Sequence, residues 1–282
     1  MHGEHNYCAQ LVRDGDHGRY LTALYAQARA RPRLFALYAL NVELAHVRAA
    51  VSEPLLGEIR LTWWRETVDG CYAGTPRAHP VAQALAAAIA ATSPPRALFD
   101  AMIDGRMLEL EAAALGQDQA LLDYADLTGD AVQSLAAWLA AGAEPGPQAS
   151  AAAAAVGRAW ALVGLVRAIG FLARSGSAMV PDSFWHGHDI DPAQLYRGAI
   201  TVEIQAAAQR LAGHASHALA AARQACPRPD AALLPALLPA VLAADYLRRF
   251  ARWDYDVRHP GLEAGALTRQ LKLMWAASRR QI

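Results

Sequence analysis

The sequence has little that could cross-link the chain, attract nucleic acid or build a sheet. Cys8, Cys71 and Cys226 are odd in number, far apart and without a CxxC pair, which favours free thiols in a reducing compartment. The formal net charge at pH 7 is +0 and Lys272 is the only lysine, so the basic excess that nucleic acid binding needs is absent. Val, Ile and Thr are sparse, and no sustained alternation of period two occurs, so strands are not expected.

The sequence also lacks a recognisable targeting segment. Its start, MHGEHNYCAQLVRDGD, contains acids and no apolar run, unlike a secretory signal or an Arg-rich transit peptide. The longest apolar stretch, Ala231–Ala244, has about half the residues that a bilayer span needs and contains Pro235 and Pro239. We therefore expect a cytoplasmic protein with neither a signal nor a transit peptide, and leave peripheral contact with the inner membrane open.

What the sequence does contain favours helices. Hydrophobic residues make up 54% and charged residues 18%, and alanine, which loses no side-chain entropy in a helix, is abundant. Because helical periodicity continues along the chain, we expect one all-α domain over residues 1–282. The expected helices span about residues 16–29, 32–50, 54–72, 79–91, 93–116, 121–141, 149–173, 201–224, 230–249 and 265–280.

Two segments, Arg31–Gly74 and Leu162–Phe184, resemble the two conserved blocks of the squalene/phytoene synthase family, and Leu121–Ala125 resembles its mid-chain tyrosine helix. This resemblance implies the isoprenoid (terpenoid) synthase fold, a single helical domain around a central cavity. The residues that match are Leu34–Ala39, Trp64 and Arg65 in the first block, and Arg167, Arg174, Gly176 and Pro181 in the second.

The same resemblance locates the positions at which these enzymes carry aspartates. In the family, Mg²⁺ ions bridge an allylic diphosphate to carboxylates on two facing helices. None of the corresponding positions is acidic here, and neither alanine nor leucine can ligate Mg²⁺. We therefore expect no catalytic residue, no metal and no cofactor. The positions are Ala45, His46 and Ala49 in the first motif, and Ala168 and Leu172 in the second.

A narrower similarity concerns three runs: Asn41–Pro54, Leu165–Phe171 and Trp253–Leu262. They are similar to the branch of this family that serves the assembly of respiratory complex I. The resemblance implies a non-catalytic protein that assists this assembly. Its partners would be respiratory complex subunits or assembly proteins, and an isoprenoid or other lipid would occupy a retained pocket.

Two other functions stay open. The first is a divergent transferase that condenses farnesyl or geranylgeranyl diphosphate, with Mg²⁺ held by Glu43, Asp104 and Glu109. The pair Asp100 and Asp104 has the i, i+4 spacing of a metal clamp, but it also suits the first turn of a solvated helix. The second is a lipid carrier without a protein client.

The run His186-Gly-His188-Asp189 has no third soft ligand nearby and is interpreted as a loop.

The cations offer two further hypotheses. In the family, basic residues of the motif helices help to hold diphosphate, so arginines retained without aspartates could bind a lipid phosphate or diphosphate without metal. The alternative is that they cap helices and form surface pairs. This set is Arg48, Arg60, Arg65, Arg167 and Arg174.

The C-terminal segment is basic and amphipathic, a pattern that suits an anionic membrane surface or an ordinary packed helix with snorkelling side chains. Its cations are Arg269, Lys272, Arg279 and Arg280, and its apolar residues are Leu267, Leu271, Met274 and Trp275.

Overall fold

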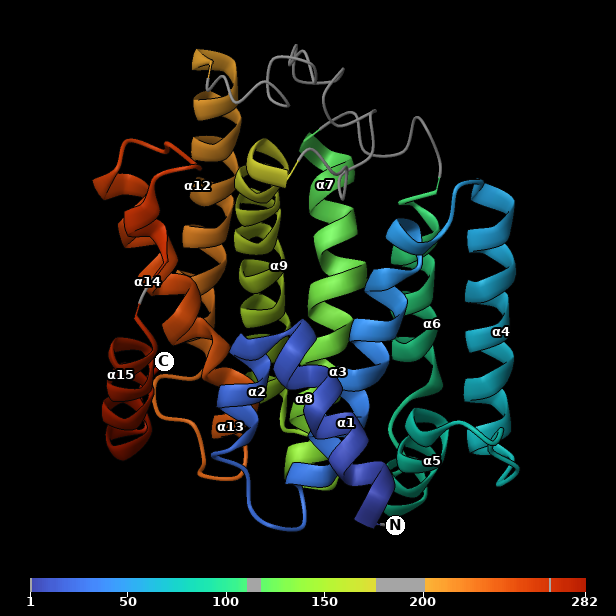
Figure 1. Cartoon of the computed structure of the whole chain (residues 1–282). Helices are drawn as coiled ribbons and strands as arrows, with labels where there is room; N and C mark the ends of the chain where they lie inside the picture. The colour runs from blue at the N-terminus through green and yellow to red at the C-terminus, as the bar shows by residue number, and fades with distance from the viewer. Residues whose placement is uncertain (1, 111–117, 176–200, 264) are drawn as a thin grey trace.

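The computed structural model describes residues 2–110, 118–175, 201–263 and 265–282 of the chain (Figure 1). All regular structure in these ranges is helical, which confirms the all-α prediction. The elements are α1 (His2–Gly15), α2 (His17–Ala23), α3 (Arg31–His46), η1 (Arg48–Ala50), α4 (Pro54–Tyr72), α5 (Pro80–Thr92), α6 (Arg96–Met107), α7 (Asp118–Ala125), η2 (Asp126–Asp130), α8 (Ala131–Ala141), α9 (Pro147–Ser175), α12 (Val202–Ala225), α13 (Leu234–Leu237), α14 (Pro239–Arg252), η3 (Pro260–Leu262) and α15 (Ala266–Arg279).

Local sequence sets most helix boundaries. The Asp16 carboxylate accepts a hydrogen bond from the backbone N–H of Arg19 at 3.0 Å, as an N-cap should. Thr201 caps α12 in the same way, and Gly142 ends α8 in the left-handed region at φ +83°. The helix predicted over residues 16–29 is shorter than expected, because α2 stops at Ala23, and α1 was not predicted at all.

The centre of the molecule is formed by α3 and α9 (Figure 1). Every residue of α3 from Leu34 to Val42 is buried, so this helix is surrounded by others. It packs against α1, α5 and α8, and α8 in turn packs against α9, which also contacts α12 and α14. By length and composition, residues Pro147–Ile169 of α9 could cross a membrane, but half of that stretch is buried inside the fold, as in the core helix of a globular protein.

A wide turn interrupts the long helix predicted over residues 121–141. Asp126–Asp130 form a π-helical turn between α7 and α8, in which backbone hydrogen bonds join residues five apart instead of four. Here Gly129 meets Gly157 of α9 with the two backbones in contact, because a Cβ at either glycine would overlap the other residue's carbonyl oxygen. The paired glycines therefore bring α9 close to the turn that follows Tyr124.

Candidate functional site

A cavity of about 330 Å³ lies between the C-terminal end of α3, the start of α2, and the inner faces of α9 and α14. Ala45, His46 and Ala49 line it from α3 and η1, and Ala168 lines it from α9. The structure thus brings together four of the five positions at which the resemblance places metal-binding aspartates. The side chain of the fifth, Leu172, lies outside the described residues.

Two acids, Asp16 and Glu109, line the described part of this cavity, and each is already engaged. Asp16 caps α2 and forms an ion pair with Arg19, with 2.9 Å between the carboxylate and the guanidinium. Each of its two oxygens is thus already engaged, one by the backbone of α2 and the other by Arg19.

Glu109 is held by Arg106 and Tyr124. Its carboxylate lies 2.5 Å from the Arg106 guanidinium and accepts a 2.5 Å hydrogen bond from the Tyr124 hydroxyl, which itself accepts one from Arg106 at 2.9 Å. Only 7% of the Glu109 side chain is exposed. Burial raises the pKa of Tyr124, and the opposing charge of Arg106 does not cancel this effect, so the phenol stays protonated and donates.

The other two acids proposed for a divergent transferase lie elsewhere. Glu43 lines a smaller cavity of about 250 Å³ that also contains Arg60 and Trp63. Asp104 accepts a 2.5 Å hydrogen bond from Arg65. Within the described ranges, no group of three or more His, Cys, Asp or Glu side chains is placed to hold a metal ion.

The arginines predicted to bind an anion do not all lie at this cavity either. Arg48 and Arg167 line the cavity, whereas Arg60 lies at the smaller one. Arg65 bonds to Asp100 at 2.7 Å as well as to Asp104, as the surface-pair interpretation expects. The side chain of Arg174 lies outside the described residues, as does the run His186–Asp189.

Arg167 is the cavity cation with most capacity for a ligand. It stacks over the Tyr246 ring at 4.5 Å, its Nε is buried without a hydrogen-bond partner, and its closest carboxylate oxygen, on Glu263, is 3.9 Å away. Arg48 lines the same cavity and forms no ion pair within the described part of the chain. Two guanidinium groups therefore retain donors for an incoming anion.

Sequence reasoning missed three cavity arginines, Arg19, Arg106 and Arg269. Arg106 could have been found, because Glu109 follows it at i, i+3 within the helix predicted over residues 93–116. Arg269 was predicted only as a cation of the C-terminal segment, and its place at the cavity was missed because α15 comes next to the cavity only through tertiary packing.

The cavity lining combines guanidinium and amide donors with apolar side chains. Ala161, Leu165 and Leu242 provide hydrocarbon, and Asn41 adds an amide. Mg²⁺ requires several oxygen ligands, and both carboxylates here are committed to arginines, so the described donor set does not fit that ion. It fits an anionic head group attached to an apolar chain.

A sequence profile described as squalene/phytoene synthase matches residues 12–273. This chain belongs to the squalene/phytoene synthase family. Over 261 residues it is 28% identical to the NADH dehydrogenase (ubiquinone) complex I assembly factor 6 of Homo sapiens, an alignment that spans 93% of this chain and 78% of the relative. It is 26% identical to a phytoene synthase of Cereibacter sphaeroides over 283 residues, which cover 95% of this chain and 77% of that enzyme.

Solved structures of squalene/phytoene synthase family type confirm the fold. A dehydrosqualene synthase in complex with ligand superposes with a TM-score of 0.77 at 15% identity, covering 98% of this chain and 96% of that one. Squalene synthase HpnC from Alicyclobacillus acidocaldarius gives 0.72 at 16% identity, covering 90% and 95%. Both have the all-α isoprenoid synthase fold that the sequence resemblance predicted.

Proposed function

We propose that this family member is non-catalytic, assists the assembly of respiratory complex I, and holds a phosphate-bearing isoprenoid or other lipid in its cavity without a divalent metal. The observation that supports this most is the composition of the cavity wall. Ala45, Ala49 and Ala168 line the cavity at positions where the sequence resemblance places carboxylates, while Arg48 and Arg167 retain unused donors.

The second support is the extent of similarity to complex I assembly factors. The human and bovine proteins named complex I assembly factor 6 align over 93% of this chain, at 28% and 29% identity. The similarity therefore includes the cavity helices and not only the packing core. This extent of similarity supports a role in assembly for the present chain.

Calorimetry with farnesyl diphosphate in EDTA tests the cavity directly. We expect binding without Mg²⁺, and we expect Arg48→Gln and Arg167→Gln each to weaken it about tenfold, since a hydrogen bond to a charged group contributes roughly 1.5–3 kcal/mol. Arg13→Gln, on the exposed surface of α1, is the matched control and should bind as the unmodified protein does. Binding that appears only with Mg²⁺ would contradict the proposal.

The assembly role needs a cellular test. Deleting the gene should reduce assembled complex I on native gels while its subunits are still synthesised, and re-expression should restore it. Re-expression of the Arg48→Gln/Arg167→Gln double variant then shows whether the ligand is required. Unchanged complex I in the deletion strain would refute the assembly role and leave a lipid carrier without a client.

The alternative is a divergent transferase, supported by the similarity to a phytoene synthase. It would require Glu43, Asp104 and Glu109 to act together, yet they lie in three different surroundings. Condensation of farnesyl or geranylgeranyl diphosphate that EDTA abolishes would establish this activity and exclude the proposed one.

A further inference from the structure

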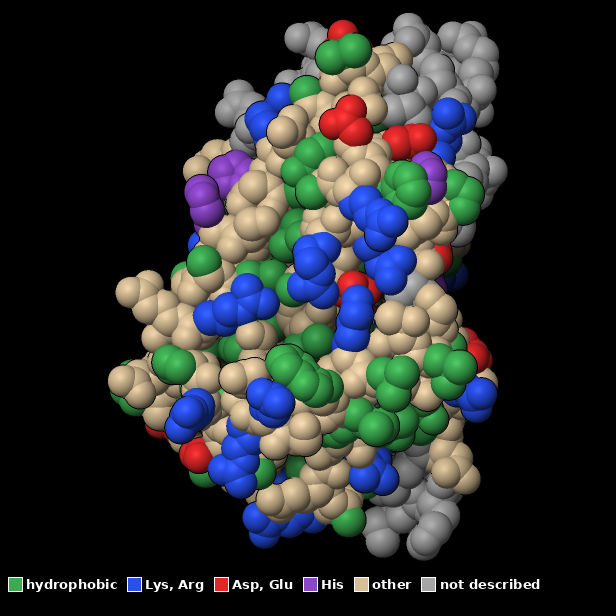
Figure 2. Space-filling view, turned by 90° about the vertical axis from the view of Figure 1, so that its left-hand side faces the viewer, with side chains coloured by type: hydrophobic (Ala, Val, Ile, Leu, Met, Phe, Trp, Pro, Cys, Tyr) green, Lys and Arg blue, Asp and Glu red, His purple; other side chains and the backbone are tan. Residues whose placement is uncertain are grey.

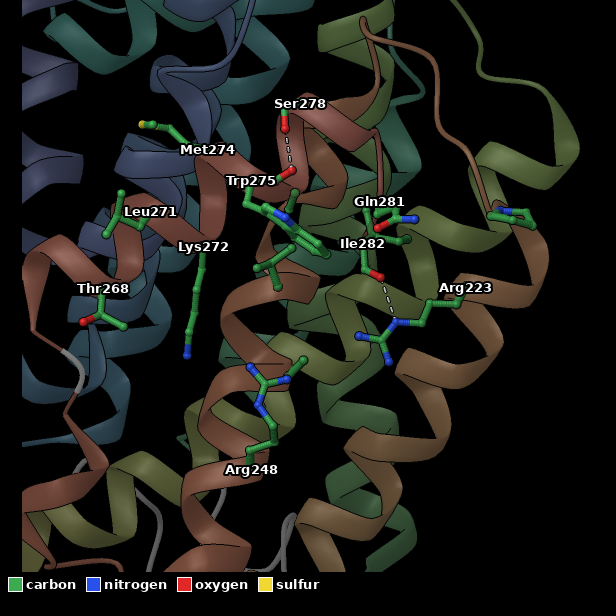
Figure 3. A pocket seen from close by; sticks show the side chains of 14 residues that line it. Arg223, Arg248, Thr268, Leu271, Lys272, Met274, Trp275, Ser278, Gln281 and Ile282 are labelled. Carbon is green, nitrogen blue, oxygen red and sulfur yellow. Dashed lines mark hydrogen bonds between the residues drawn. The ribbon is translucent and has the colours of Figure 1, made fainter.

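A second and larger hollow lies on the outside of the molecule, between α14, α15 and the end of α12 (Figure 3). This outer groove has a volume of about 1040 Å³. Trp275 and Lys272 extend from α15 into it, and Arg248 rises from α14 toward them (Figure 3). The groove contains no residue of the inner cavity, so its role is independent of the function proposed above.

The helix that borders this groove, α15, has two apolar faces. One packs inward through Leu273 and Ala276, which are its buried residues. The other is exposed, with a spacing of i, i+4, i+7 and i+8 that places its members along one side of the helix. This exposed stripe consists of Leu267, Leu271, Met274 and Trp275.

The groove also carries an excess of positive charge. Asp245 is a nearly buried carboxylate that faces three cations: Lys272, Arg249 at 3.1 Å and Arg248 at 3.3 Å. One negative charge cannot balance three positive ones. Arg223, at the rim, donates from Nε to an oxygen of Ile282 at 2.7 Å, and the described lining contains no Asp or Glu side chain.

The surrounding surface continues this pattern. Figure 2 shows that Lys and Arg side chains predominate over Asp and Glu on the face of the molecule that includes α15, with apolar side chains between them. The Arg279 guanidinium lies over the ring of the exposed Trp275, 4.8 Å from its centroid, so a cation accompanies this tryptophan at the surface. Tryptophan in such surroundings prefers the boundary between water and lipid.

We propose that the exposed stripe of α15 and the outer groove dock on an anionic phospholipid bilayer. The helix lies along the bilayer surface with Leu271, Met274 and Trp275 among the upper acyl chains. Lys272 and Arg248 then meet the phosphate groups, which supply the negative charge that Asp245 alone does not. A hydrophobic stripe bordered by cations is the arrangement that binds such surfaces.

Sedimentation of the full chain with vesicles tests this. We expect binding to phosphatidylcholine vesicles that contain about 30% phosphatidylglycerol, weak binding to phosphatidylcholine alone, and loss of binding at high salt. Leu271→Ser/Met274→Ser should weaken binding at least about tenfold, because two buried side chains are removed from lipid. Arg248→Gln should weaken it about fivefold.

The chain offers close controls for both changes. Leu55 and Ile59, on the outer face of α4, are 61% and 57% exposed, compared with 61% and 56% for Leu271 and Met274. Leu55→Ser/Ile59→Ser should therefore leave vesicle binding unchanged, as should Arg29→Gln.

Three results would overturn the docking proposal. They are equal binding to neutral and anionic vesicles, equal losses in the two serine double variants, and a dimer that Leu271→Ser/Met274→Ser converts to monomer while vesicles are not bound. The last result would mean that a second copy of the chain covers the groove. Failure of the cavity to bind farnesyl diphosphate would leave this test unaffected.

Discussion

Replacing Glu109 with glutamine should remove a large part of the stability of this protein. The substitution leaves the Arg106 guanidinium, of which 13% of the side chain is exposed, without its ion-pair partner. It also weakens the 2.5 Å hydrogen bond that Tyr124 donates. Breaking a buried ion pair from one side costs about 3–5 kcal/mol, because the remaining charge stays out of water without compensation. Folded proteins have a net stability of only about 5–15 kcal/mol.

The measurement is urea unfolding followed by circular dichroism, together with a thermal melt. We expect the free energy of unfolding of Glu109→Gln to fall by about 3–5 kcal/mol, and the melting temperature by about 10 °C for a chain of this size. Asp104→Asn is the control. Asp104 also pairs with an arginine at 2.5 Å, but 55% of its side chain is exposed, so its loss should cost less than about 1 kcal/mol.

A double variant sharpens the test. Arg106→Gln/Glu109→Gln removes both charges, so it should be more stable than Glu109→Gln alone. Suppose instead that Glu109→Gln is as stable as the unmodified protein, or more stable. The ion pair with Arg106 would then not stabilise the fold, and stability would not explain why a carboxylate is buried at this position. The carboxylate would then be a candidate functional group, which would favour the transferase alternative.

Three further outcomes are expected. Gly157→Ala should lower the free energy of unfolding by at least about 2 kcal/mol in urea, because its Cβ meets the backbone of the π turn, whereas Gly213→Ala, with open space around it, should raise it by about 0.5–1 kcal/mol. Burial raises the pKa of Cys71 to about 11, so iodoacetamide at neutral pH should modify Cys226 first and Cys71 only after unfolding, as peptide mass mapping would show; rapid modification of native Cys71 would contradict this. Burial alone raises the pKa of Asp245, but its cation partners outweigh burial and lower the pKa. The ionised carboxylate therefore stabilises the fold fully above its ordinary pKa, and this contribution is lost as the pH falls. Asp245→Asn should accordingly lose less free energy of unfolding on acidification than the unmodified protein.

Much of the helical architecture follows from local sequence. Pro54 and Tyr72 bound α4 as the sequence predicts, and Asp16 caps α2. The missed helix α1 begins with polar residues, and its apolar positions Cys8 and Val12 take on meaning only when they are buried against other helices. Helix ends without a strong cap depend on tertiary packing, which periodicity does not contain.

The candidate site, too, was predicted from the sequence only in part. Ala45, Ala49 and Ala168 come together at one cavity, as the family pattern on two helices implies. Arg65 does not join them, because Asp100 and Asp104 of α6 lie beside α4, and no spacing within one helix reveals a partner on another. The extent of the domain over residues 1–282, the absence of a cofactor and the cytoplasmic location remain predictions.

The π turn at Asp126–Asp130 has a consequence for the evolution of this chain. An extra residue in a helical turn rotates everything beyond it by about 100° relative to an unbroken α-helix. Tyr124, before the turn, reaches Glu109, and Gln133, beyond it, donates to the carbonyl oxygen of Ala236. Deleting one residue between them would restore a regular helix and turn one of these two side chains away from its acceptor. Natural variation in length should therefore be tolerated in the surface loops and selected against in these five residues.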